Sequence, residues 1–196
     1  MNRCLHAILA GAFALLAGSG PCAVRAEQAT PLPGDSLYQL DIPLTDQRGR
    51  DFRLPDLRGR VQVVAMFYTS CRYVCPLIID TIRHIERAVP AERRIGFDVL
   101  LVSFDPARDD VAALASVASR RGLDTARWRL VRTDDGNVRS LAAALGIQYR
   151  RLADGEYNHA SLVTLLDVDG RIRAQTGKLG EADPEFVAAL DRLLDR

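Results

Sequence analysis

Residues 61–85 read VQVVAMFYTSCRYVCPLIIDTIRHI, and this stretch decides the fold that the sequence predicts. Its first eight residues, Val61 to Tyr68, are apolar apart from one Gln, as in a strand buried on both faces of a sheet. Beyond the two cysteines, apolar residues recur at helical spacing, so an amphipathic helix is expected there. A strand that runs into a helix, with Cys71 and Cys75 at the junction, predicts an α/β fold that presents two thiols at a strand end.

The rest of the chain continues this alternation of strands and helices. Further strands are expected at Phe97–Ser103 and Trp128–Val131, and helices at Val111–Ser119, at Val138–Leu145 and from Asp183–Pro184 onward. Two hairpins flank these elements, one from Tyr38–Ile42 with Arg50–Phe52 and one from Leu162–Leu166 with Ile172–Gln175, each with Gly in its turn. The pattern therefore predicts a layered α/β sandwich with a mixed central sheet, flanking helices and an N-terminal β-hairpin.

The first 26 residues are expected to be an export signal. Arg3 precedes an apolar run from Leu5 to Ala17, and Val24-Arg25-Ala26 offers a small-x-small cleavage site before Glu27. The apolar run is shorter than the roughly 20 residues that a membrane-spanning helix needs. We therefore expect a periplasmic protein, with membrane association only through an uncleaved N-terminal segment.

The exported chain is expected to have a flexible leader over residues 27–36 and one domain over residues 37–196. Removing the signal takes the formal charge from +1 to −1. A near-neutral chain without a basic block has no electrostatic footprint for nucleic acid, so no nucleic-acid partner is expected.

Export also changes the number of cysteines. Cys4 and Cys22 leave with the signal, and a lipoprotein alternative based on Cys22 is disfavoured by the preceding Pro21. Cys71 and Cys75 then remain alone in an oxidising compartment, where an unprotected pair tends to close.

Three readings of this pair are open. Two thiols at i and i+4 on a helix differ by about 40° around the axis, so both would face one point. A purely structural disulfide is disfavoured, because closing so small a loop removes little entropy from the unfolded chain. A redox pair is favoured by the helix start, where the positive end of the helix dipole lowers a thiol pKa.

A metal site would need a third ligand. His84 lies nine residues beyond Cys75 on the same expected helix, about 180° round, so it should point away. Met66 is expected inside a core strand. His159 lies in a polar loop just before the strand Ser161–Leu166, and it can approach the cysteines if that strand lies beside the one that ends at Tyr68. Two thiolates and an imidazole suit Cu(I), and zinc remains open on ligand type.

Three segments carry a family resemblance: FYTSCRYVCP (67–76), VSFDPARDD (102–110) and YNHASLVTLLDVDGRI (157–172) resemble the Sco/SenC family of copper-handling proteins. The resemblance implies a thioredoxin-like, three-layer fold and one copper per chain, bound by Cys71, Cys75 and His159. It also implies a periplasmic role in supplying copper to the dinuclear copper site of cytochrome oxidase, or in reducing its thiols. The implied partner is a copper-receiving oxidase subunit or another copper chaperone.

The chain departs from the family pattern beside the histidine. It has Asn158-His159-Ala160 where many members have Asp-His-Ser or Asp-His-Thr, so a carboxylate partner for the imidazole is expected to be missing. Asp105 and Asp109 match the family's acidic loop. We expect them to serve a capped turn, with Asp105 ending a strand and Asp109 starting a helix.

Two functions follow as hypotheses. One is a copper metallochaperone that uses Cys71, Cys75 and His159. The alternative is a thiol-disulfide oxidoreductase in which Cys71 attacks, Cys75 resolves and His159 tunes the thiolate. A peroxide-reducing role is a third alternative, for which Thr69 and Arg72 form no defined pattern.

Overall fold

The computed structural model describes residues 31–195, and the expected export signal lies outside them. Seven strands form the main sheet, in the order β2-β1-β5-β4-β3-β8-β9. The strands are β1 (Pro43–Asp46), β2 (Asp51–Arg53), β3 (Val61–Phe67), β4 (Phe97–Ser103), β5 (Trp128–Arg132), β8 (Val163–Leu166) and β9 (Ile172–Thr176). β3, β4 and β5 are parallel, whereas β8 pairs with β3 in the antiparallel sense, so the sheet is mixed as expected.

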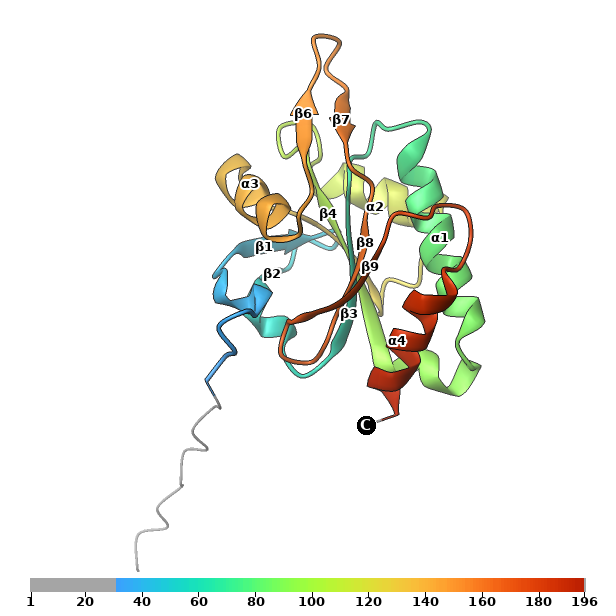
Figure 1. The fold of residues 1–196 in the computed structure, drawn as a ribbon. Helices are drawn as coiled ribbons and strands as arrows, with labels where there is room; N and C mark the ends of the chain where they lie inside the picture. Colours follow the sequence, from blue (N-terminus) through green and yellow to red (C-terminus); the bar gives the residue numbers. More distant parts are fainter. Residues whose placement is uncertain (1–30, 196) are drawn as a thin grey trace, which may run out of the picture. The chain divides into compact units, whose positions relative to one another are not determined.

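Helices cover both faces of this sheet, as Figure 1 shows. They are α1 (Val74–Ala88), α2 (Val111–Arg120), α3 (Asp135–Ala144) and α4 (Pro184–Leu194). Three short 3-10 turns add η1 (Leu37–Gln39), η2 (Leu54–Leu57) and η3 (Ala91–Gly96). The helices α1, α2 and α4 lie on one side and α3 on the other, which confirms the layered α/β architecture. None of the helices among residues 31–195 has the length and apolar character required to cross a bilayer.

The core is centred on the two middle strands. Every residue of β3 and of β4 is buried, because each strand has neighbours on both edges and helices over both faces. The expected strand Phe97–Ser103 is confirmed with both ends as predicted, and the helix expected at Val111–Ser119 extends one residue further, to Arg120.

The N-terminal hairpin is present, but its first strand is displaced from the predicted position. β1 begins at Pro43, whereas Tyr38 belongs to the 3-10 turn η1, so the strand expected over Tyr38–Ile42 is wrong. Tyr38 and Ile42 are both buried, but the turn buries Tyr38 by folding its ring onto Gly170. Within the expected leader, Ser36 is buried and its side chain caps this turn.

A second, two-stranded sheet projects from the main one and carries His159. β6 (Tyr149–Arg151) pairs antiparallel with β7 (Tyr157–His159), and β7 lies in a segment that was expected to be only a polar loop. The hairpin stands above the end of the main sheet at which β3 terminates (Figure 1). Since β8 follows β7 directly and pairs with β3, the condition for His159 to approach the cysteines is met.

Candidate metal centre

The two cysteines lie just beyond the end of β3. The chain bends after Tyr68, and α1 begins only at Val74, with Tyr73 at its N-cap position. Pro76 sets this start, because a proline ring clashes with the carbonyl group four residues earlier and so tolerates only the first turn of a helix. Cys71 therefore precedes the helix, and the expectation that both thiols share one helical face is wrong.

A different interaction brings the two sulfurs together. The backbone N–H of Cys75 donates a hydrogen bond to Sγ of Cys71 at 3.3 Å. The first N–H groups of a helix have no partner within the helix, and Tyr73 supplies no side-chain cap. The sulfur of Cys71 takes that place, so the N-terminus of α1 points at it.

This arrangement makes the two thiols unequal. Hydrogen bonding from Cys75, with further contributions from His159 and from backbone N–H groups, holds the pKa of Cys71 well below the usual thiol range despite its partial burial. The same interaction with Cys71, together with burial of a side chain only 3% exposed, raises the pKa of Cys75. Both thiols are free, and Cys71 is the one that carries the charge and faces solvent.

His159 ends β7 with its ring against the protein. Its ring centroid lies 4.9 Å from that of Phe104 and 6.2 Å from that of Tyr68. Nδ1 lies 3.2 Å from the carbonyl oxygen of Ala160, while Asn158 is exposed. A backbone carbonyl thus stands where the missing carboxylate partner of the imidazole was expected, and Nε2 is left for a metal or for Cys71.

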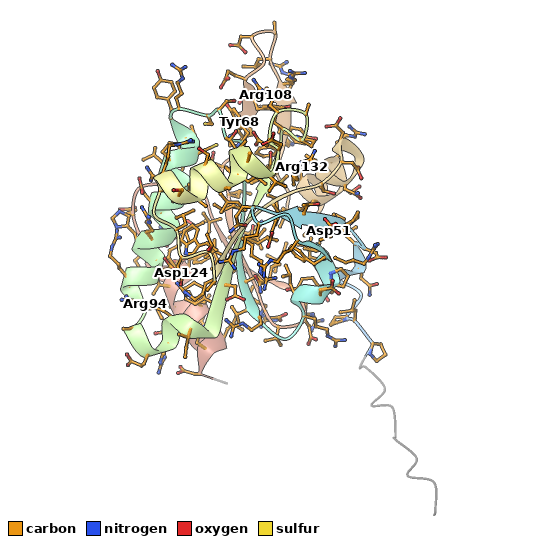
Figure 2. The ribbon with its side chains drawn as sticks, turned by 180° about the vertical axis from the view of Figure 1, so that it is seen from behind. Asp51, Tyr68, Arg94, Arg108, Asp124 and Arg132 are labelled. Carbon is orange, nitrogen blue, oxygen red and sulfur yellow. The ribbon has the colours of Figure 1, made fainter. Side chains whose placement is uncertain are left out.

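Several contacts hold the hairpin of β6 and β7 over the end of β3. The Tyr68 hydroxyl donates to Oε2 of Glu156 at 2.9 Å, and the Arg108 guanidinium donates to the carbonyl oxygen of Gly155. Tyr68, Phe104, Tyr149 and Tyr157 form an aromatic cluster with the ring of His159. Figure 2 shows Tyr68 and Arg108 together at this end of the molecule. The contacts made by Tyr68 and Glu156 were not predicted from the sequence. A signal for the hairpin was present, since the ring-bearing residues Tyr149, Tyr157 and His159 are each next to polar residues.

The two acidic residues of the loop after β4 have different roles. Asp105 is buried next to the strand end and forms an ion pair with Arg108, as a turn residue would. Asp109 does not start a helix, because Asp110 is the N-cap of α2. Asp109 is instead fully buried and accepts hydrogen bonds from Thr69 N–H at 3.0 Å, from the Thr69 hydroxyl and from the Ser103 hydroxyl.

Asp109 therefore fastens the segment that leads to Cys71 onto the end of β4. The sequence identified the residue but not this role, since two adjacent aspartates look equally suited to cap a helix.

The other candidate ligands lie elsewhere. His84 is on α1, and its Nδ1 lies 3.0 Å from the Nη2 of Arg87, one turn further along the helix. Met66 is 2% exposed within β3. Neither is brought to the cysteines.

The donor set at the site fits copper. Two thiol sulfurs and one imidazole nitrogen are the soft and intermediate ligands that select Cu(I). Among residues 31–195 no three His, Cys, Asp or Glu side chains already surround one point, and Cys71 alone links the pair to His159.

Comparison with known proteins gives the family. The SCO1/SenC family model matches residues 33–195. A candidate copper-binding protein of Stutzerimonas stutzeri is 27% identical over 138 residues, which cover 67% of this chain and 65% of that protein. The chain therefore spans about two thirds of the length of that relative.

Solved structures agree with this match. Bradyrhizobium japonicum ScoI, solved with copper bound, is 26% identical with a TM-score of 0.65, over 78% of this chain and 96% of that one. BsSco, a member of the Sco family of cytochrome c oxidase assembly proteins, shares the fold with a TM-score of 0.66 at 18% identity, over 84% of this chain and 98% of that one. The matched residues include the cysteine pair, the acidic loop and the histidine hairpin, and the fold is thioredoxin-like. The chain belongs to the SCO1/SenC family.

Proposed function

We propose that this protein is an exported copper metallochaperone that binds one copper ion and supplies it for the dinuclear copper site of cytochrome c oxidase. The observation that carries the proposal is the pairing of Cys71 and Cys75 at the end of β3, with His159 beside Cys71 on β7. Copper in the B. japonicum relative and oxidase assembly by the family of BsSco support it.

Each residue has a defined part in holding the cargo. Cys71 offers a thiolate at neutral pH, because its neighbours already stabilise the negative charge on its sulfur. Cys75 must lose its proton to become a second ligand, so copper binding releases protons from this pair. His159 offers Nε2 while the Ala160 carbonyl orients its ring.

Release to a partner is favoured by the same arrangement. Cys71 and His159 are partly exposed, whereas Cys75 is buried. A partner's thiols can therefore replace the two accessible ligands first and the buried sulfur last.

Copper titration tests the proposal directly. The reduced protein is titrated with Cu(I) against a competing chelator, beside the Cys71→Ser, His159→Ala and His84→Ala variants. We expect one copper per chain, with affinity weakened at least about 100-fold by the first two changes and unaltered by the third, because removal of a ligand exceeds the 10-fold to 100-fold effect of outer partners. Unchanged affinity in His159→Ala would refute the three-ligand site.

Thiol-disulfide exchange is a second candidate function, and the inequality of the two thiols favours it. The Cys71 thiolate attacks one sulfur of a partner's disulfide and displaces the other as a thiolate. Cys75 then loses its proton and attacks Cys71, which leaves the partner reduced by two electrons and this protein with a Cys71–Cys75 disulfide. This reaction needs no imidazole, so the His159→Ala variant separates the two functions.

The periplasmic location rests on the N-terminal sequence. Cell fractionation with sequencing of the mature N-terminus is expected to find the protein in the periplasm, beginning at or near Glu27. A full-length chain retained in the membrane fraction would instead assign an uncleaved anchor.

A further inference from the structure

Two hollows flank the candidate site. One, of about 150 Å³, lies beside both cysteines, with apolar side chains such as Ile79 and Val117 in its wall. The other, of about 450 Å³ and wide open, lies against His159 on the β6–β7 hairpin.

The only charged side chains that line the two hollows are arginines. Arg120 and Arg121 border the first hollow, Arg150 borders the second, and no Asp or Glu lines either one. Arg120 and Arg150 are exposed and form no ion pair with any of residues 31–195, and the same holds for Arg72, between the two cysteines. Arg121 is partly neutralised by Asp80. The rim of the site therefore carries uncompensated positive charge.

Several carboxylates of the same end of the molecule are engaged within the protein. Asp109 is fully buried, and Asp105 is buried and paired with Arg108. Glu156 accepts the hydrogen bond of Tyr68. Asp154 is exposed, but it lies in the loop between β6 and β7 and accepts the backbone N–H of Glu156. Asp110 and Asp134 are exposed at the N-caps of α2 and α3, but neither lines a hollow, so arginine supplies the formal charge at both hollows.

Two exposed side chains with apolar surface lie in the same segment of the chain as the cysteines. Tyr73, between the two cysteines, is 82% exposed, and Leu77 on the first turns of α1 is 45% exposed. Aromatic residues and arginine are the residue types enriched at the centres of protein interfaces.

From this surface we propose that the partner protein docks with an acidic face, placing carboxylates around its own thiols against Arg72, Arg120 and Arg150 and an apolar side chain against Tyr73. The inference rests on the proposed function, since it describes the face of whatever receives copper or electrons from Cys71. A second copy of this chain is a poor occupant, because a two-fold contact through this face would bring the same arginines together.

Disulfide-bonded peptides test the charge preference without copper. Three synthetic peptides carry the same pair of cysteines as a disulfide, flanked by glutamates, by glutamines or by lysines. The reduced protein transfers two electrons to such a peptide: Cys71 attacks, a peptide thiolate leaves, and Cys75 closes the disulfide with Cys71 and frees the second peptide thiol.

We expect the glutamate peptide to react about 10-fold faster than the lysine peptide at about 20 mM salt, and this advantage to shrink at about 300 mM salt, since exposed charges are screened. Replacing both arginines, Arg120→Glu with Arg150→Glu, should abolish the preference. The matched control is Arg192→Glu on α4, an exposed arginine without an ion pair within residues 31–195, and it should leave the preference intact.

Equal rates with the glutamate and lysine peptides at low salt, or no reaction with the glutamate peptide, would overturn the proposal. So would binding to phosphatidylglycerol vesicles that depends on Arg120 while the peptides show no preference, because the surface would then serve a lipid headgroup. Cu(I) titration of the same variants tests the proposed copper function separately from the proposed acidic partner. A charge preference without copper binding would refute the chaperone function alone, and copper binding without a preference would refute the acidic partner alone.

Discussion

The hydroxyl of Tyr68 donates a hydrogen bond to Oε2 of Glu156, 2.9 Å away, and so joins the end of β3 to the hairpin that carries His159. The two residues are 88 positions apart in the sequence. The hydroxyl also receives the backbone N–H of Tyr157 at 3.5 Å, and the two tyrosine rings lie 5.2 Å apart. One side chain thus fixes both the position and the tilt of β7 beside the cysteines.

Tyr68→Phe should weaken copper binding while leaving the fold intact. The change keeps the ring in the aromatic cluster and removes the hydrogen bond to Glu156, so His159 is held less firmly. We expect a loss of about 10-fold in Cu(I) affinity, the scale of an outer partner of a ligand. The free energy of unfolding should fall by about 1 kcal/mol. Chelator competition and urea denaturation measure the two effects.

Tyr149→Phe is the control for this prediction, because Tyr149 packs in the same cluster but its hydroxyl has no hydrogen bond within residues 31–195. It should leave copper affinity unchanged. Equal losses in both variants would show that the cluster, and not the Tyr68 hydroxyl, holds the hairpin.

Asp109→Asn should be strongly destabilising for a change of one atom. The buried carboxylate accepts from one N–H and two hydroxyl groups, and an amide would turn two hydrogens toward groups that already donate. A loss of about 2 kcal/mol in unfolding free energy is expected.

The neighbouring Asp110→Asn serves as its control, since Asn caps a helix about as well as Asp does and the change should cost almost nothing. Thermal or urea unfolding of both variants measures the two losses in unfolding free energy. A stable Asp109→Asn protein would mean that the hydroxyls of Thr69 and Ser103 rotate to accept from the amide.

The two thiols should differ in their reaction with iodoacetamide as pH changes. Because hydrogen bonding lowers the pKa of Cys71, while the hydrogen bond to Cys71 and then burial raise that of Cys75, Cys71 should be alkylated at pH values where an ordinary thiol is protonated. Because the pKa of Cys71 is lowered to about 3, single-cysteine modification is followed by mass spectrometry from about pH 2 to about pH 9, a range in which Cys75 should stay unreactive.

His159→Ala removes one of the interactions that stabilise the Cys71 thiolate, so the midpoint for its alkylation should move toward higher pH. The lowered pKa also makes the contribution of Cys71 to stability largest at and above the usual thiol pKa, and that contribution declines as pH falls toward the lowered value. Equal alkylation of both cysteines at every pH would contradict this account.

Gly170→Ala should destabilise the domain through a contact outside the proposed copper site. Gly170 has a φ of +80°, and a Cβ there would lie 2.6 Å from the ring of Tyr38, which is buried. An alanine backbone at this positive φ is strained by about 1 kcal/mol, and its Cβ must also displace the Tyr38 ring. Together the two effects should lower the free energy of unfolding by about 3 kcal/mol.

Gly180→Ala is matched in backbone conformation, with a φ of +85°, but a Cβ there would have no atom within 4 Å. The Gly180→Ala variant should lose only the part of the unfolding free energy that comes from backbone strain. If urea denaturation gave the same loss for both, the contact with Tyr38 would contribute nothing.

The elements with strong patterns were predictable from the sequence. The largely apolar strands β3 and β4, whose residues are all buried, and the helix α2 are found within one or two residues of their expected bounds, because burial on both faces leaves few other ways to place such residues. The hairpin of β6 and β7 was not predictable, because each of its strands has three residues and none is fully buried.

For the cysteine pair, the predicted contact between the two side chains is correct, but the geometry from which it was predicted is wrong. The spacing of Cys71 and Cys75 predicted neighbouring thiols on one helix. The structure brings them together by a bend that ends in a hydrogen bond to sulfur, because Pro76 prevents the helix from starting earlier. Likewise, no local signal tells that Asp109 turns inward while Asp110 caps the helix, since that choice depends on Thr69 and Ser103 from other parts of the chain.

The pairing of β8 with β3 also sets an order of events during folding. β3 forms its parallel ladder with β4, which follows it closely along the chain, whereas β8 is made only after two further helices and three further strands have been synthesised. Contacts between distant parts of a chain form slowly, because a long loop must close before they bring any gain. We therefore expect a folding chain to have its two thiols in place before its imidazole, so that until β8 docks it presents a dithiol that oxidants and metals can reach.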